Sequence, residues 1–416
     1  MKKIILYCFL CCIISFTVFA QSSTPYSRYG IGDVEYTNSA RRAAIGSLGA
    51  AVFDNNFISV LNPASWSGIK LTRVEFNTSY NGLFLKSNNI NTYYGKLVIK
   101  GFDIAIPISP KYGISSVLGI SAYSTVSYKS VENYFSPTDL VDNYTLTYEG
   151  DGGLSKFFIG GSYRLPFNLF VGASFDYYFG NLKYFSNTNF INSSNFNASY
   201  EKKISPKGIG SSVGLISPDF SSLFGDGIIT NFRIGLSLNY VSTLNADTVY
   251  ATSSANGIDT ISFGSTNIKI PSRYTAGLGI VLNKKFLVSL DYSVQPWSKF
   301  EIYNKTSEYL RNASKYSLGF EYDPITKAGD SFWEQFIWRA GLSYEQTQYY
   351  INGQGINKFT IGGGFSLPIT ELNTIDVGIN YSFKGTTEFN LIKENVLQIN
   401  FGISLGDLWF IRYHDN

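Results

Sequence analysis

Few residues in this chain could perform acid–base, nucleophilic or metal chemistry. Its single histidine, His414, stands near the C-terminus. A serine hydrolase would therefore lack its histidine base, and there is no Cys/His cluster for a transition metal. Asp54, Asp219 and Asp226 are isolated in turn-like stretches and do not form a calcium loop. The sequence predicts a protein that is not an enzyme and holds neither a metal nor a cofactor.

Two arginines remain as candidates for ligand binding. Arg273 and Arg339 both fall on the polar side of stretches in which apolar and polar residues alternate. A guanidinium group can bind the carboxylate of a fatty acid through two parallel hydrogen bonds. The alternative is a structural ion pair with an acidic residue such as Glu321 or Asp291. Trp297 and Trp338 are expected among the aromatic residues of the outer wall.

The N-terminus has the pattern of a secretory signal peptide. Lys2 and Lys3 precede an apolar run over residues 4–14, and a cleavage site ends at Ala20. All three cysteines, Cys8, Cys11 and Cys12, lie inside this segment. The processed chain is therefore expected to contain no thiol or disulfide. A lipoprotein is the alternative, but bulky residues precede the cysteines.

Charge and hydropathy exclude some classes of protein. Removing Lys2 and Lys3 from the 33 basic residues leaves the processed chain nearly neutral against 30 acidic residues, so nucleic acid is not expected as a partner. No later apolar stretch is long enough for a transmembrane helix. Mean hydropathy is near zero, yet aromatic residues make up 17% of the chain.

Most of the chain after residue 71 alternates with a period of two. Phe232, Ile234 and Leu236 alternate with Arg233 and Gly235, for example. Aromatic residues on one side and charged residues and glycine on the other are typical of an outer-membrane barrel. We therefore predict an all-β fold, a transmembrane antiparallel β-barrel of about fourteen strands with both ends in the periplasm. A soluble sandwich also alternates and is the alternative.

The connections support the barrel because short turns alternate with longer polar segments. Short turns are expected at 110–113, 166–168, 283–285 and 368–373. Long external loops are expected at 130–142, 181–198, 244–266 and 296–313. Two periplasmic connections, 217–227 and 323–332, are longer than this pattern predicts.

The stretch from Asn38 to Trp66 does not alternate and is rich in small residues, which allow close backbone packing. We expect it to fill the barrel lumen as a plug, with Asn55, Asn62, Pro63 and Ala64 as its site residues. The expected domains are a signal peptide (1–20), an N-terminal arm and plug (21–70), the barrel (71–406) and a C-terminal tail (407–416).

Residues 39–46 followed by Asn62-Pro63-Ala64 resemble the hatch of the FadL/TodX family of outer-membrane transporters. Further matches lie at 270–279 and 338–344, whereas Ser65 replaces the family's usual glycine. The resemblance, to a Bacteroidetes-like member, implies a monomeric barrel in the outer membrane of a Gram-negative bacterium. It also implies passive uptake of long-chain fatty acids or similar hydrophobic compounds, with lipid and a hydrophobic small molecule as partners.

A second hypothesis uses the same barrel differently. FadL-like barrels of the PorV type interact with secreted proteins and assist their passage to the cell surface, so secreted proteins are the alternative partners. A third hypothesis, a soluble all-β binding protein, follows from the sandwich alternative.

Overall fold

The computed structural model describes residues 24–87, 91–135, 143–190, 196–225, 227–254, 257–324, 331–370 and 372–407. The expected signal peptide, and the expected tail apart from Asp407, lie outside the described residues. Within these ranges, no helix is long and apolar enough to cross a membrane.

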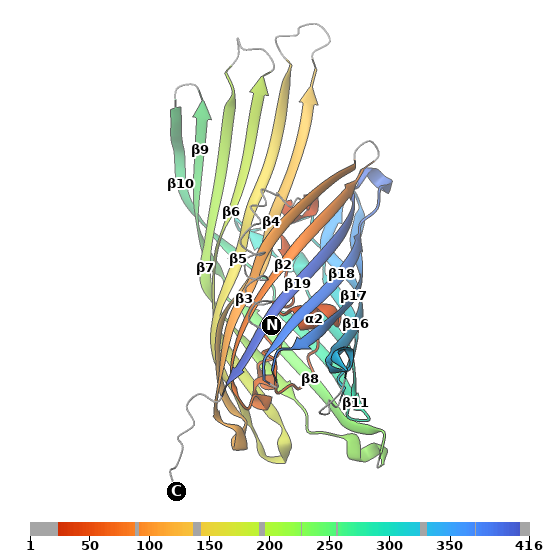
Figure 1. Cartoon of the computed structure of the whole chain (residues 1–416). Helices are drawn as coiled ribbons and strands as arrows, with labels where there is room; N and C mark the ends of the chain where they lie inside the picture. The colour runs from red at the N-terminus through yellow and green to blue at the C-terminus, as the bar shows by residue number, and fades with distance from the viewer. Residues whose placement is uncertain are drawn as a thin grey trace.

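A closed antiparallel β-barrel of fourteen wall strands makes up most of the molecule (Figure 1). The wall strands are β2 (Thr72–Lys86), β3 (Asn91–Ser109), β4 (Ile114–Tyr134), β5 (Tyr144–Arg164), β6 (Phe170–Phe190), β7 (Ala198–Ile216), β8 (Ile229–Val241) continued by β9 (Leu244–Ser254), β10 (Gly257–Lys269) continued by β11 (Arg273–Leu282), β12 (Phe286–Gln295), β15 (Ala313–Tyr322), β16 (Ile337–Ile351), β17 (Gln354–Pro368), β18 (Thr374–Lys384) and β19 (Lys393–Asp407). β19 pairs with β2 from Asp407 opposite Thr72 to Lys393 opposite Lys86, which closes the barrel. The predicted fold class is confirmed, and a closed barrel replaces the sandwich considered as its alternative.

The alternation of the sequence places polar side chains inside and apolar ones outside. On β6, Phe175 is 52% and Tyr177 is 40% exposed, whereas Asp176 between them is fully buried. Successive residues of a strand point to opposite faces, so this pattern continues along the wall. We call the end that contains Thr72 and Asp407 the near end and the opposite end the far end.

Short helices and hairpins join the strands. The near-end turns contain 3-10 helices η3 (Pro110–Tyr112), η5 (Pro166–Asn168), η6 (Ser221–Phe224) and η8 (Phe332–Gln335). The far end carries η7 (Trp297–Lys299), the hairpin β13 (Glu301–Ile302) and β14 (Lys305–Thr306), and η9 (Glu388–Asn390). The short turns expected at 110–113, 166–168 and 283–285 are present, and the fourth lies between the end of β17 and the start of β18, where residue 371 is outside the described residues.

Most of residues 24–70 are buried, and the helices of this segment contact the wall strands. The segment forms η1 (Pro25–Arg28), β1 (Asp33–Val34), α2 (Ala40–Ala44) and η2 (Pro63–Gly68). α2 contacts strands β16 to β19, whereas η2 contacts strands β4 to β7 in another part of the wall. All five residues of α2 and all six of η2 are buried.

Glycines in the wall let this segment approach closely. A Cβ atom on Gly341 would meet the backbone of Ile45 and Gly46, and one on Gly172 would meet the backbone of Pro63 and Ala64. The small residues of the segment therefore face positions in the wall that have no side chain.

Several strands continue far beyond the rest of the wall at the far end. β4, β5 and β6 have 21 residues each, about twice the roughly 9–11 residues with which a tilted strand crosses a membrane. Together with β7, β9 and β10 they form a free-standing sheet above the barrel (Figure 1). We call this part the extended sheet.

The extended sheet corrects three expectations from the sequence. Residues 130–142 were expected to form a loop, but β4 continues to Tyr134, and 136–142 lie outside the described residues. Residues 181–198 were also expected to form a loop, but β6 continues to Phe190 and β7 begins at Ala198. Residues 244–266 form most of the β9–β10 hairpin. A sheet that stands clear of the rest of the barrel has little to pack against, so an Asn/Ser/Thr-rich composition does not exclude strands there.

The wall opens between β3 and β4. These strands pair only from Ser109 opposite Ile114 to Gly101 opposite Ser121. Beyond this point the N-terminal segment takes the place of β3, because Asp33 pairs with Thr125 and the Glu35 backbone N–H donates to Tyr123 at 2.9 Å. The edge of β4 is thus covered in part by residues 24–37 of the chain, which we call the arm.

Candidate functional site

A buried charge network fastens α2 to the wall. Arg41 donates to Glu321 of β15 from Nε at 2.8 Å and from Nη2 at 2.6 Å. Arg339 of β16 donates from Nε to the same carboxylate at 2.6 Å and contacts Asp376 of β18 at 3.3 Å. Arg41 also pairs with Asp54 of the segment. Arg41 and Arg339 therefore share the carboxylate of Glu321, and the network joins residues 24–70 to β15, β16 and β18.

Arg339 lies inside this network. Its Nη1 also donates to Ser366 at 2.6 Å, and only 1% of its side chain is exposed. The pairing with Glu321 is the structural alternative considered from the sequence. A role for Arg339 in ligand binding stays a prediction, and a ligand carboxylate would have to compete with Glu321 and Asp376.

Within the described part of the chain, the hydrogen bonds of Arg273 go to the arm and to a glutamine, not to an acidic side chain. Its Nη1 donates to the Glu35 carbonyl and its Nε to Gln295, both at 3.2 Å, and its guanidinium lies 4.7 Å from the ring centre of Tyr36. Arg273 and Asn239 both line a small cavity of about 40 Å³. Ligand binding by Arg273 likewise stays a prediction.

Asn62 is the most fully bonded of the predicted plug residues. Its buried Nδ2 donates to Ala50 at 2.6 Å and to Leu215 of β7 at 3.2 Å, while its Oδ1 accepts from Ala64 at 3.1 Å. Pro63 begins η2, and Ala64 is buried against the wall. Asn55 is exposed, and its carbonyl accepts from Arg73 at 3.3 Å.

Arg42, next to Arg41, is buried without comparable partners. Its Nε and Nη1 have no hydrogen-bond partner among the described residues, and Nη2 reaches the Val52 carbonyl at 3.4 Å. Burial, and then the charge of Arg41, lowers the pKa of Arg42 to about 9. The sequence carries no signal that separates these adjacent arginines.

The larger lumen cavity is polar. It has a volume of about 130 Å³, and its lining includes four lysines and four acidic residues: Lys100, Lys315, Lys358, Lys384, Asp33, Glu35, Glu345 and Glu394. Charges this dense favour water over an apolar ligand, because a buried charge must keep polar partners. Burial disfavours the ionised form of Asp33, but Lys384 at 2.9 Å holds the pKa of Asp33 below its usual range.

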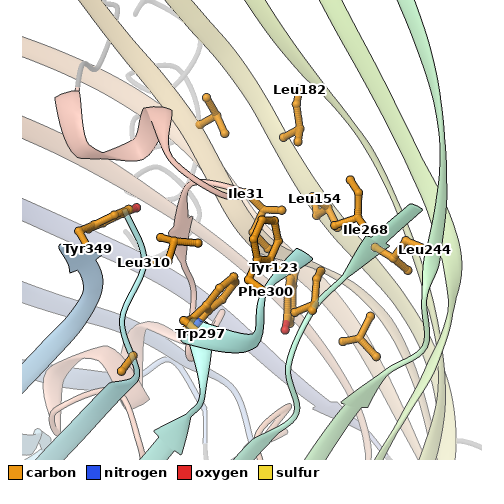
Figure 2. Packing of buried hydrophobic residues seen from close by; sticks show 14 of the residues in the cluster. Ile31, Tyr123, Leu154, Leu182, Leu244, Ile268, Trp297, Phe300, Leu310 and Tyr349 are labelled. Atoms are coloured by element: carbon orange, nitrogen blue, oxygen red, sulfur yellow. The ribbon is translucent and has the colours of Figure 1, made fainter. Parts of the chain in front are cut away.

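The apolar part of the lumen is occupied by the chain itself. Tyr26 and Ile31 of the arm pack in one cluster with Trp297, Phe300 and Tyr349. Figure 2 shows Ile31 close to Phe300 and Trp297. Trp297 is 1% exposed, so the expectation of an outer-wall position was wrong for it. Trp297 lies in η7, a short helix at the far end of the lumen, and not in a wall strand. We call the far end of the lumen the mouth. Trp338 is 42% exposed, in keeping with its expected outward position on β16.

The comparisons with known proteins agree on the fold. The model of a family described as BamG matches residues 1–416, while no curated protein matches the chain. The toluene transporter TbuX of Ralstonia pickettii is 15% identical with a TM-score of 0.59, covering 88% of this chain and 98% of its own. The toluene transporter TodX of Pseudomonas putida is 16% identical with a TM-score of 0.58, covering 91% and 99%.

A third solved structure, the CymD monoaromatic hydrocarbon channel, is 17% identical with a TM-score of 0.55, covering 90% of this chain and 98% of its own. At these identities the likeness concerns the fold. The barrel that the FadL/TodX resemblance implied is therefore confirmed over nearly the whole chain.

Proposed function

This chain belongs to the BamG family, and we propose that it is an outer-membrane barrel that acts as an interaction protein, binding another protein outside the cell. In this proposal residues 24–70 are a plug, the near end faces the periplasm, and the extended sheet projects from the cell surface. The partner class corresponds to the second hypothesis drawn from the sequence.

The outward face of the wall supports a membrane location. Leu290, Leu318 and Ile361 point outward from three strands and are 54%, 46% and 49% exposed. Side chains of this kind around the whole barrel are stable in lipid and costly in water. An open groove on the same surface, bordered by Leu215, Leu236 and Tyr274, would contact lipid chains.

One observation carries the interaction proposal. The apolar space within the lumen is filled by Tyr26 and Ile31, while the wall on one side continues into a sheet that transport through a barrel does not need. A long, regular sheet held outside the membrane is a rigid platform on which a partner can be bound.

The test removes the extended sheet and keeps the barrel. Residues 128–150, 184–202 and 249–263 are each replaced by a two-residue Asn-Gly turn, since their flanking residues are paired in register. A strain lacking the protein receives either the intact or the shortened barrel, and other surface-exposed proteins are quantified after surface labelling.

We expect the deletion to deplete specific surface proteins, the intact barrel to restore them, and the shortened barrel to fail. Restoration by the shortened barrel, shown to be folded in the outer membrane by heat-modifiable migration, would refute the proposal. An unchanged set of surface proteins in the deletion strain would also count against it.

A second candidate function is passage of hydrophobic compounds, including long-chain fatty acids. The opening between β3 and β4 favours it, because it offers a sideways route from the mouth to the membrane. The solved structures of similar fold include toluene transporters. In this case Tyr26 and Ile31 must leave the apolar cluster for a ligand to enter.

Uptake of a labelled long-chain fatty acid, and of labelled toluene, tests this candidate. Saturable uptake by the intact protein that changes when residues 39–66 are deleted would support passage. Uptake equal to that of cells without the protein would exclude it.

A further inference from the structure

The two faces of the extended sheet differ sharply in composition. Cross-strand pairing places residues on the face that continues the lumen side: Tyr128 and Tyr134 of β4, Tyr148 of β5, Tyr184 of β6, Tyr200 of β7 and Tyr250 of β9. We call this the tyrosine face. Across β4 to β7 and β9, Glu132 and Lys202 are its only charged residues within the described part of the extended sheet.

The opposite face of the same five strands is charged. It carries Lys129, Glu149, Asp151, Lys183, Glu201, Lys203, Lys207 and Asp247, and its aromatic residues among those described are Phe179 and Phe185. Ion pairs such as Lys207 with Asp247 at 2.9 Å suit a face in water. Two faces in the same solvent need no such difference, so the tyrosine face calls for an explanation of its own.

The tyrosines form a continuous surface. Tyr128 and Tyr184 pack on the apolar cluster of the mouth, with 6.4 Å between their ring centres. Further out, Tyr134 stacks on Tyr144 at 4.8 Å, and Tyr200 lies 6.2 Å from Tyr250. Tyr134, Tyr148 and Tyr200 are 43%, 38% and 38% exposed. The core of the mouth thus continues outward as an accessible aromatic face.

The size of this face is comparable with that of a small protein interface. The five strands have five to seven described residues each from Tyr128 outward, and at about 4.8 Å between strands they cover roughly 500 Å². A specific protein interface takes about 800 Å² from each partner. Aromatic residues are enriched and charged residues depleted at the centre of such interfaces.

We propose that the tyrosine face binds the folded surface of another polypeptide, one that is uncharged where it makes contact. This inference rests on the proposed function and names its binding surface. One acidic and one basic residue leave the face without net charge, whereas an anionic glycolipid requires a cluster of lysine or arginine.

The test places a photo-crosslinking amino acid on either face in living cells. Positions Tyr148 and Tyr200 probe the tyrosine face, and Asn187 and Lys203 probe the opposite face of the neighbouring strands. The crosslinked partner is identified by mass spectrometry, purified, and titrated against the whole barrel in lipid nanodiscs.

We expect one discrete, protease-sensitive adduct from Tyr148 and Tyr200 and none from Asn187 and Lys203. Two truncated hot-spot tyrosines are expected to weaken binding by about 100-fold or more, so the Tyr148→Ser/Tyr200→Ser variant should lose that much affinity. The matched Lys183→Ser/Lys203→Ser variant should bind within about 2-fold of the intact barrel.

The outcomes separate this inference from the proposed function. Adducts from the opposite face alone would overturn the tyrosine face and leave the interaction proposal intact. A protease-resistant glycolipid adduct would overturn the polypeptide partner. Adducts from neither face would overturn both the tyrosine face and the interaction proposal. Equal affinities of the two double variants would overturn the tyrosine face, and restoration of surface proteins by the shortened barrel would overturn the interaction proposal as well.

Discussion

Arg41 of α2 and Glu321 of β15 form a two-point ion pair, with 2.8 Å between Nε and Oε2 and 2.6 Å between Nη2 and Oε1. They are 280 residues apart in the sequence and join the inner segment to the wall. Because Arg339 shares the same carboxylate, this contact is the centre of the lumen network.

Adjacent arginines should respond oppositely to the same substitution. Arg41→Met leaves Asp54 without its partner in the network and Glu321 with Arg339 alone, and breaking a buried pair costs about 3–5 kcal/mol. Arg42→Met removes a buried charge whose Nε and Nη1 have no partner among the described residues, so it should be neutral or stabilising. Thermal unfolding of the two purified variants in detergent measures the difference, and equal losses would contradict the network.

Asn62→Ala should loosen the segment. It leaves the carbonyl of Ala50 and the amide of Ala64 unsatisfied in a buried site, at a cost of about 1–3 kcal/mol for each group. Asn55→Ala is the control, because Asn55 is exposed and makes its contact to Arg73 through its backbone. Limited proteolysis of folded barrels should cleave the first variant faster, and equal rates would show that Asn62 does not anchor the segment.

Gly341→Ala should displace α2. The new methyl group would meet the backbone of Ile45 and Gly46, neither of which can move as a side chain could. Gly363→Ala on the next strand is the matched control, since its methyl group would meet nothing closer than 3.5 Å. We expect Trp66 fluorescence to change in the first variant only, and an unchanged spectrum in both would contradict the close packing.

Acid should release the arm through Asp33. Its pKa is lowered in the folded protein, so its contribution to stability is present above the unfolded pKa, near 4, and is lost as the pH falls through the lower folded value. A dye on Arg28→Cys should therefore report a docked arm from pH 7 down to about 4 and release below it. Asp33→Asn should release the arm at pH 7, and a pH profile unchanged by this substitution would exclude the Lys384 contact.

The sequence predicted the barrel well because its side-chain period sets both faces of every wall strand. Alternations such as Phe232, Ile234 and Leu236 against Arg233 leave no other register in a membrane. The arginine pairing was foreseen as an alternative because Glu321 and Arg339 both fall on the polar face. The partner Arg41 was not foreseen, since nothing in a short small-residue stretch indicates which strand it will meet.

The extended sheet was missed for a physical reason. Its strands are rich in Asn, Ser and Thr, which also form loops, and in the proposed orientation neither face lies in lipid. Tyr184, Tyr200 and Tyr250 were present in those segments as a signal, but their common face depends on pairing between strands. The filling of the mouth by Ile31 and Trp297 likewise depends on contacts between distant parts of the chain.

The most direct measurement locks the lumen and asks whether the protein still functions. Val34 and Ser124 are paired in antiparallel register, so cysteines at these positions can form a disulfide that fixes the arm across the opening beside β4. Interaction through the extended sheet predicts that the oxidised Val34→Cys/Ser124→Cys barrel restores surface proteins as fully as the reduced one. Loss of function on oxidation, with recovery on reduction, would show that the arm must move and that passage through the lumen is the activity.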